Sequence, residues 1–172
     1  MIVLLYLSMK YIFLDFDGVI SPSKQYTSER APFYAKFPKA KLLGIPYAFC
    51  SECVEILNQF LVDGVEIIIS SDWKDWNSFK DLCDIFEMNG IKKLPIAITP
   101  NLHYNDPNES RDSRRIREIE EYLSNNQIDN WIVIDDLDLS KFGKRFIKTN
   151  QDRGLNDTNV IKLISKFINE DQ

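Results

Sequence analysis

The chain has 172 residues, of which 44% are hydrophobic and 27% charged, a composition typical of one globular domain with a buried core. Its formal net charge of −5 argues against general electrostatic binding of nucleic acid, although a local basic patch is compatible with this net charge. The apolar start is too short for a transmembrane helix and lacks the basic region and cleavage site of a signal peptide. We therefore expect a cytoplasmic protein with no membrane partner.

The predicted elements alternate between apolar strands and amphipathic helices along the whole chain, so we expect residues 1–172 to form one domain. Residues 1–9 are expected to be an N-terminal extension, and the sequence leaves open whether translation starts at Met1 or Met9. The strands are predicted at 10–16, 65–70, 95–99, 131–135 and 145–149, and the helices at 50–62, 74–88, 114–124 and 157–168. This alternation predicts an α/β fold: a three-layer, Rossmann-like parallel sheet of about five strands with helices on both faces.

Two stretches lack such periodicity, at 21–48 and at 100–113. Long irregular loops in a compact α/β domain are often functional, and ligands in this architecture bind outside the carboxyl ends of the strands. Each loop follows the carboxyl end of a predicted strand, directly or nearly so. We therefore expect both to be substrate-side loops.

Acidic side chains end two of the predicted strands. The first strand ends in "LDFDG", where alternation places Asp15 and Asp17 on one face, and the fourth ends in Asp135 and Asp136. Two acid pairs at the tips of parallel strands concentrate more negative charge than one place tolerates without a cation. A hard divalent ion such as Mg²⁺, bound through oxygens, removes this difficulty. A carboxylate held beside such an ion stays ionised and can attack phosphorus.

Hydroxyl and basic side chains accompany these acids. The second strand ends in Ser70 and Ser71, and three arginines, Arg111, Arg114 and Arg115, precede or open the helix ahead of the fourth strand. A serine hydroxyl and a fixed cation are the groups that hold phosphoryl oxygens.

Three neighbouring features each allow two interpretations. Asp72 either orients the site or caps the helix that follows it. Trp73 and Trp76 either pack the start of that helix or stack on a base. Cys50 and Cys53 form a C-x-x-C pair that suits redox or zinc chemistry, or are small apolar residues on one face of a helix.

The motifs together resemble those of the haloacid dehalogenase (HAD) superfamily of phosphohydrolases. "FLDFDGVI" matches its first motif, hhhDxDGxh, and "IIIS", ending at Ser70, matches its second. A basic residue ahead of the fourth strand matches the third motif, and "IVIDD" matches the fourth. The resemblance extends from about Lys10 to Phe167. We expect no large cap domain, because the interval from Asp17 to Ser70 already contains a helix of the sheet.

A narrower resemblance links the chain to the small HAD domains grouped with Swiss Army Knife RNA-repair proteins. It rests on "IIISSDWK", "TPNL", "RRIREIEEYL", "WIVIDDLD" and "FIKTNQDRGL". Lys74 stands where that group usually has arginine, and Tyr122 where it usually has a second tryptophan.

The resemblance implies a role for each matching residue. Asp15 is the nucleophile that forms an aspartyl-phosphate, and Asp17 is the general acid and then base. Ser70 holds the phosphoryl group, with Ser71 as the alternative register, and Arg115 is the third-motif cation, with Arg114 as the fallback. The implied metal is Mg²⁺, held by Asp15, Asp17, Asp135 and Asp136, with Asp17 contributing its backbone carbonyl.

The function implied is a Mg²⁺-dependent phosphomonoester hydrolase whose substrate the sequence does not name. An alternative is a nucleic-acid end-processing phosphatase, 3′ or 5′, which the RNA-repair resemblance favours and the acidic net charge opposes. A further alternative is a non-catalytic binding module that keeps the fold. The expected partner is a phosphorylated substrate, either a small molecule or a nucleic-acid end, and the oligomeric state is not readable from the sequence.

Overall fold

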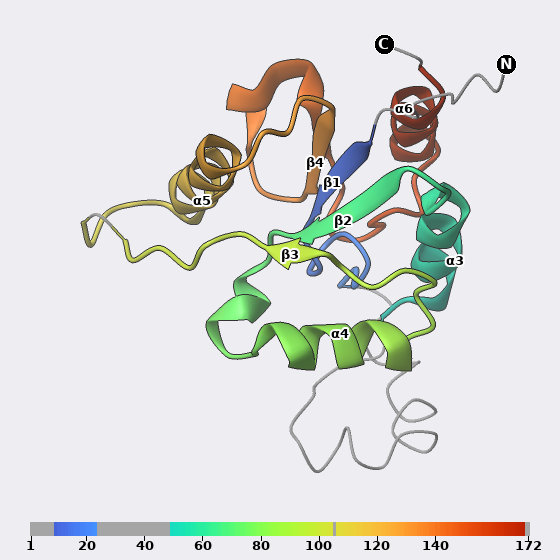
Figure 1. Cartoon of the computed structure of the whole chain (residues 1–172), viewed down its shortest axis with the longest axis horizontal. Helices are drawn as coiled ribbons and strands as arrows, with labels where there is room; N and C mark the ends of the chain where they lie inside the picture. Colours follow the sequence, from blue (N-terminus) through green and yellow to red (C-terminus); the bar gives the residue numbers. More distant parts are fainter. Residues whose placement is uncertain (1–8, 24–48, 105, 171–172) are drawn as a thin grey trace, which may run out of the picture.

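The computed structural model describes residues 9–23, 49–104 and 106–170 (Figure 1). Five parallel strands form one sheet in the order β3-β2-β1-β4-β5. The strands are β1 (Lys10–Leu14), β2 (Val65–Ile69), β3 (Ala97–Ile98), β4 (Trp131–Asp135) and β5 (Phe146–Lys148). The predicted α/β class and the parallel sheet of about five strands are therefore confirmed.

Helices cover both faces of this sheet, so the fold has three layers (Figure 1). The helical elements are α3 (Ser51–Phe60), η1 (Asp72–Asp75), α4 (Phe79–Met88), α5 (Arg111–Asn125), η2 (Ser140–Arg145) and α6 (Thr158–Asn169). The apolar faces of α3, α4 and α6 pack in one core cluster with one face of the sheet, and α5 packs with η2 on the other face.

Strand β1 shows how the sequence produces these two cores. Its side chains alternate between the faces of the sheet, so Ile12 and Leu14 join the core beneath α3, α4 and α6, while Phe13 joins the core beneath α5. All three are fully buried. A strand covered on both faces is apolar at every position, which explains the unbroken apolar run that precedes the acids.

The predicted helix over 74–88 is wrong at its start. The short helix η1 ends at Asp75, and α4 begins only at Phe79. The break is stable because Ser78 and Asp81 form a capping box, in which each side chain binds the backbone of the other. The helix predicted to start at 114 begins at Arg111, which shortens the predicted loop 100–113, and η2 was not predicted at all.

Several expectations fall on parts of the chain outside the described residues. These are most of the N-terminal extension, residues 1–8, and most of the loop 21–48. In the ranges that the structure describes, no large cap domain is inserted between the strands. Cys50 and Cys53 are both buried in the core, at the N-terminus of α3. None of the helices in the described part of the chain has the length and apolar character needed to cross a membrane.

Candidate active site

The register of the sheet brings the predicted site residues to one edge. The ends of β2 and β4 both lie level with the end of β1. Asp15 directly follows β1, Ser70 directly follows β2, and Asp135 is the last residue of β4. The residues two positions before them, Phe13, Ile68 and Val133, all belong to the core beneath α5. Because side chains alternate along a strand, the three site residues face α5 as well.

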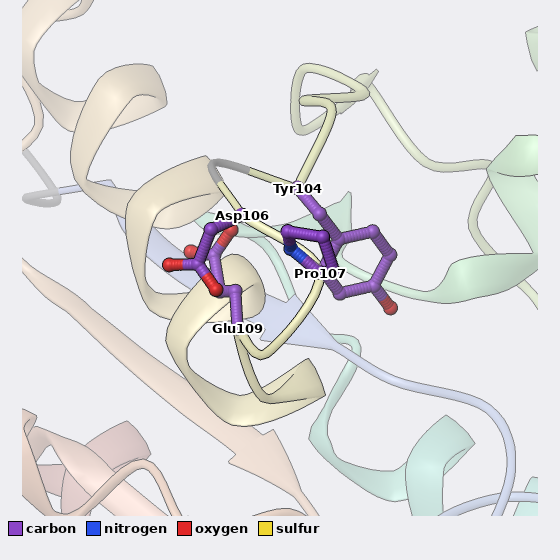
Figure 2. A pocket seen from close by; sticks show the side chains of 4 residues that line it. All are labelled: Tyr104, Asp106, Pro107 and Glu109. Atoms are coloured by element: carbon purple, nitrogen blue, oxygen red, sulfur yellow. The ribbon is translucent and has the colours of Figure 1, made fainter.

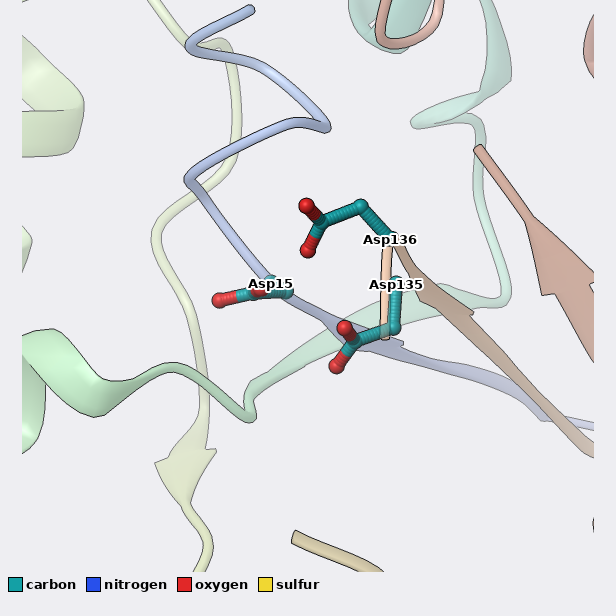
Figure 3. Close-up of side chains that lie close together, drawn as sticks. All are labelled: Asp15, Asp135 and Asp136. Atoms are coloured by element: carbon teal, nitrogen blue, oxygen red, sulfur yellow. The ribbon is translucent and has the colours of Figure 1, made fainter. Parts of the chain in front are cut away.

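Three carboxylates converge at this edge. Oxygen atoms of Asp15, Asp135 and Asp136 all lie within 4.8 Å of one another (Figure 3). Asp15 and Asp135 are buried, and Asp136 is partly exposed. The carboxylate of Asp17 is not part of this group. We call Asp15, Asp135 and Asp136 the acid cluster.

The acid cluster carries a surplus of negative charge. Burial, and then the charge of Asp15, raise the pKa of Asp135 well above its usual range, against the opposing effect of Arg115. Burial and Asp15 likewise raise the pKa of Asp136. A divalent cation bound by these oxygens would remove the repulsion and keep the carboxylates ionised. Carboxylate oxygens are the ligands that hard cations such as Mg²⁺ prefer, so the donor set fits such an ion.

Arg115 is the buried cation beside this cluster. Its Nη1 donates to the backbone carbonyl of Ser70 at 2.6 Å and to the carboxylate of Asp135, and it lies 3.4 Å from Oδ1 of Asp15. Its Nη2 donates to Oδ1 of Asp72 at 2.8 Å. Burial alone would lower the pKa of Arg115, but the surrounding carboxylates raise it well above its usual value. The guanidinium is therefore a permanent charge in the site.

The neighbouring Arg114 points elsewhere. Its Nη2 binds the carboxylate of Asp75 at 2.7 and 2.8 Å, and its Nε donates to Glu118 at 3.0 Å. The guanidinium also lies over the ring of Tyr104, 4.9 Å from its centre. Of the two arginines considered for the third motif, the structure thus brings Arg115 to the acid cluster and engages Arg114 in a different network.

The two serines after β2 differ in what their hydroxyl groups contact. Ser71 is the N-cap of η1, and its hydroxyl accepts the backbone N–H of Trp73 at 3.5 Å. Ser70 is fully buried, and its hydroxyl has no hydrogen-bond partner among the described residues. A buried hydroxyl without a partner is uncommon, and it leaves Ser70 with a donor to offer a ligand.

Asp17 lies on the turn after β1 and is exposed to solvent. Its Oδ2 accepts a hydrogen bond from the indole Nε1 of Trp73 at 2.9 Å. Desolvation of the carboxyl group, and also the charge of Asp15, raise the pKa of Asp17, while the Trp73 hydrogen bond acts in the opposite direction. Trp73 itself is buried and packs at the start of η1.

The sequence left the role of Asp72 open. Ser71, not Asp72, caps η1, and the Asp72 carboxylate instead binds two arginines. Arg111 donates to Oδ2 of Asp72 through Nε at 3.0 Å and through Nη2 at 2.7 Å, while Arg115 binds Oδ1. The signal for this was the spacing of Arg111 and Arg115, which places both on one face of a helix. Burial alone would raise the pKa of Asp72, but Arg115 and then Arg111 hold it well below its usual range.

Gly18 allows Asp136 to approach the turn after β1. Its φ of 69° lies in the left-handed region, which favours glycine. A Cβ atom at this position would lie 2.6 Å from the carboxyl carbon of Asp136. Any larger residue would therefore displace a member of the acid cluster.

The segment after β5 supports this turn from behind. The Thr149 hydroxyl donates to the carbonyl of Gly18 at 2.8 Å, and the backbone N–H of Leu155 donates to the carbonyl of Val19 at 2.9 Å. Gly154, with φ of 56°, lies so close to Val19 that a side chain would clash with its carbonyl. The late "T…GL" pattern thus matches residues that hold the active-site turn.

The loop between β3 and α5 carries a separate surface hollow of about 510 Å³. It is lined by Tyr104, Asp106, Pro107 and Glu109 (Figure 2). None of these residues belongs to the acid cluster, and Glu109 is already paired with Arg117 at 2.7 Å. Because its charged lining is acidic, the hollow does not suit a phosphate group.

A parallel α/β sheet whose central strands end in such an acid cluster is the arrangement of HAD-like domains, a superfamily of hydrolases. Within it, the family described as the HAD domain in Swiss Army Knife RNA repair proteins matches residues 11–160 of this chain. The match covers most of the sequence, so the chain belongs to that family, and the predicted resemblance is confirmed. No curated protein and no solved structure gives a significant match. HAD domains generally use Mg²⁺, and the acid cluster is a group of residues able to hold such an ion.

Proposed function

We propose that this protein is a Mg²⁺-dependent phosphomonoester hydrolase that acts through a phospho-Asp15 intermediate. The observation that carries the proposal is the position of Asp15, which is buried 3.4 Å from the Arg115 guanidinium and within 4.8 Å of the carboxylates of Asp135 and Asp136. A cation beside a carboxylate favours its ionised form, and the ionised form is the one that acts as a nucleophile.

The acid cluster would hold the magnesium ion, with the backbone carbonyl of Asp17 as the further ligand that the family resemblance implies. When bound, the ion supplies positive charge to the phosphoryl oxygens and to the nucleophile. Because Gly18 has no side chain, the Asp136 carboxylate has room to lie in the acid cluster. The Asp135 carboxylate is fixed by Arg115 and by the backbone N–H of Leu137 at 2.9 Å.

The chain's own residues supply the two chemical steps. In the first, a carboxylate oxygen of Asp15 attacks phosphorus, the bond from phosphorus to the ester oxygen breaks, and the leaving oxygen takes a proton from Asp17. In the second, water attacks the phosphorus of phospho-Asp15 and gives a proton to the Asp17 carboxylate, and the bond from phosphorus to the Asp15 oxygen breaks. Inorganic phosphate leaves, and both aspartates return to their initial states.

In this proposal, three groups hold the phosphoryl oxygens. The Ser70 hydroxyl has no partner among the described residues, and neither has Nε of Arg115. Arg111 provides a second cation, because Asp72 holds its guanidinium while 56% of its side chain stays exposed. Charge-assisted hydrogen bonds from such groups are stronger than neutral ones and stabilise the charge of a transferring phosphoryl group.

The substitution Asp15→Asn tests this proposal. We expect the wild-type protein to hydrolyse p-nitrophenyl phosphate when Mg²⁺ is present and to lose this activity when the ion is chelated. Asp15→Asn removes the nucleophile and should lower kcat by at least about a hundredfold, while Asp63→Asn, at an exposed turn, should leave kcat unchanged. Full activity in Asp15→Asn would contradict the mechanism. A chain that binds no Mg²⁺ in calorimetry would favour a non-catalytic binding module instead.

Membership of a family named for RNA repair favours a second candidate, a phosphatase that processes nucleic-acid ends. The net charge of −5 opposes this candidate, although the partly exposed Arg111 adds a local positive charge to the site. The test compares kcat/KM for 3′- and 5′-phosphorylated oligonucleotides with that for p-nitrophenyl phosphate. Oligonucleotides that react no faster than the small ester would exclude this candidate.

A further inference from the structure

Trp73 joins the second strand of the site to the turn that follows the first. It lies in η1, three positions after Ser70, and its indole Nε1 donates to Oδ2 of Asp17 at 2.9 Å. The two partners differ in their surroundings. Trp73 is only 5% exposed, whereas Asp17 faces solvent. The hydrogen bond therefore links an exposed carboxylate to a ring that is anchored in the core.

The ring of Trp73 has little freedom to move. It packs edge-on against Phe16 with the ring centres 5.2 Å apart, and it also contacts Phe49 at 5.7 Å. Phe16 is fully buried and stands between Asp15 and Asp17 in the sequence. The ring of Phe16, which follows the proposed nucleophile in the sequence, thus packs directly on the ring of Trp73, which binds Asp17. Aromatic pairs in this geometry add stability beyond the area that they bury.

We propose that Trp73 is a positioning residue that fixes the Asp17 carboxyl group for proton transfer to the leaving oxygen. An indole N–H only donates, so the oxygen that it contacts, Oδ2, must act as an acceptor. The other oxygen, Oδ1, is then the one left to exchange a proton with the substrate. This inference rests on the proposed function, because positioning has meaning only if Asp17 exchanges a proton with the substrate.

A fixed orientation matters because Asp17 is exposed and no other described side chain donates a hydrogen bond to its carboxylate. Without the indole, the carboxyl group would rotate among several orientations in water. Proton transfer requires the acid within hydrogen-bond reach of the leaving oxygen, and a misplacement of about 1 Å costs about a hundredfold in rate. The loss of rate caused by removing the indole should depend on the leaving group of the substrate, because a good leaving group departs without protonation.

Trp73→Phe tests the proposal, since phenylalanine keeps an aromatic ring but has no N–H group. The parameter is kcat/KM for an alkyl phosphate, which needs protonation of its leaving oxygen, and for p-nitrophenyl phosphate, which does not. We expect kcat/KM for the alkyl ester to fall by about tenfold to a hundredfold and that for the aryl ester to change by less than about threefold. Trp76→Phe is the matched control, because Trp76 is 79% exposed and should give unchanged values for both esters.

A second measurement applies even if Trp73→Phe does not fold. The chain has three tryptophans, so three indole N–H signals are expected in a ¹H–¹⁵N NMR spectrum of the full-length protein. Asp17→Asn replaces the carboxyl group that accepts this hydrogen bond by an amide group. We expect this exposed substitution to shift the Trp73 indole signal strongly and to leave those of Trp76 and Trp131 in place.

The outcomes separate this inference from the function on which it rests. A wild-type protein without phosphatase activity, or an Asp15→Asn variant with full activity, would overturn the proposed function and the positioning role with it. An active wild type combined with equal losses for both esters in folded Trp73→Phe would overturn the positioning role alone. An unchanged Trp73 indole signal in Asp17→Asn would also overturn it. A larger loss for the alkyl ester, together with a shifted signal, would support it.

Discussion

The guanidinium of Arg115 connects four parts of the fold through one planar group. It contacts a carboxylate after β1, a backbone carbonyl after β2 and the last carboxylate of β4, and it also binds Asp72 in η1. A lysine ammonium is a point charge and could not meet these partners in their fixed directions. Because Arg115 is buried, its charge acts on the site with little screening by solvent.

Gly18→Ala should weaken metal binding through Asp136. The new methyl group would lie 2.6 Å from the Asp136 carboxyl carbon and push this side chain out of the acid cluster. We expect Mg²⁺ affinity, measured by calorimetry, to fall by about tenfold or more, as it does when the groups that orient a ligand are lost.

Gly90→Ala is the control for the backbone strain in this substitution. Its φ of 75° is close to that of Gly18, but a Cβ atom there has nothing within 4 Å. Both variants should lose about 1–2 kcal/mol of stability through the left-handed conformation, and only Gly18→Ala should lose Mg²⁺ affinity. Equal Mg²⁺ affinity in the two variants would show that Asp136 does not bind the ion.

Sequence reasoning placed the acids correctly at strand ends, because a buried strand followed by a polar tip is visible in the pattern of residues. The pattern of residues alone could not choose between Arg114 and Arg115, and only the family resemblance favoured Arg115. Adjacent helical residues point about 100° apart, and the choice depends on how α5 is rotated on the sheet. That rotation is set by tertiary packing, such as the contact of Ile119 with the core beneath α5.

At the scale of elements, η1 and α5 are joined by a buried ionic network. Lys74 of η1 donates to Glu118 of α5 at 2.7 Å, with both side chains fully buried. Glu118 also accepts from Nε of Arg114 and from the backbone N–H of Leu102. Two of these three donors are cations whose charge Glu118 balances, and the network fixes the helix that carries Arg115.

Glu118→Gln should destabilise the protein strongly. The substitution leaves the buried Lys74 without its counter-charge, and the removal of one partner of a buried ion pair costs about 3–5 kcal/mol. Urea unfolding would measure this loss. Glu121→Gln, on the exposed side of the same helix, should change the free energy of unfolding by less than about 0.5 kcal/mol. A similar small effect at Glu118 would mean that the network does not stabilise the junction.

The boundaries of elements were less predictable than their existence. The split of the predicted helix 74–88 into η1 and α4 had a signal in the sequence, Ser78 followed three residues later by Asp81. The apolar spacing across the break still fits one helix, and the prediction of a continuous helix did not use the capping signal. The short helix η2 had no comparable signal, because it is held by the packing of Phe142 and Leu139 against the sheet.

For the molecule as a whole, Asp72 makes stability depend on pH. Its pKa is lowered in the fold, so between the folded and unfolded pKa values the unfolded chain binds more protons, and stability rises with pH in that window. The contribution is complete above the unfolded value of about 4 and is lost as the pH falls toward the folded value. Asp72→Asn should therefore lower the free energy of unfolding by about 2 kcal/mol at neutral pH.

Urea unfolding at several pH values would measure this effect. The difference in unfolding free energy between wild type and Asp72→Asn should be largest above about pH 5 and should shrink as the pH approaches 2. A difference that stays constant over this range would mean that the ionisation of Asp72 does not contribute to stability.

The hydrogen bond from Thr149 to the Gly18 carbonyl joins residues that are 131 positions apart in the sequence. During synthesis on a ribosome, every acid of the site, from Asp15 to Asp136, leaves the exit tunnel before the segment that supports the turn. A nascent chain that ends before Thr149 therefore holds the chemical groups of the site without the contacts that fix their geometry. The geometry of the candidate site is thus complete only when the final part of the fold has formed.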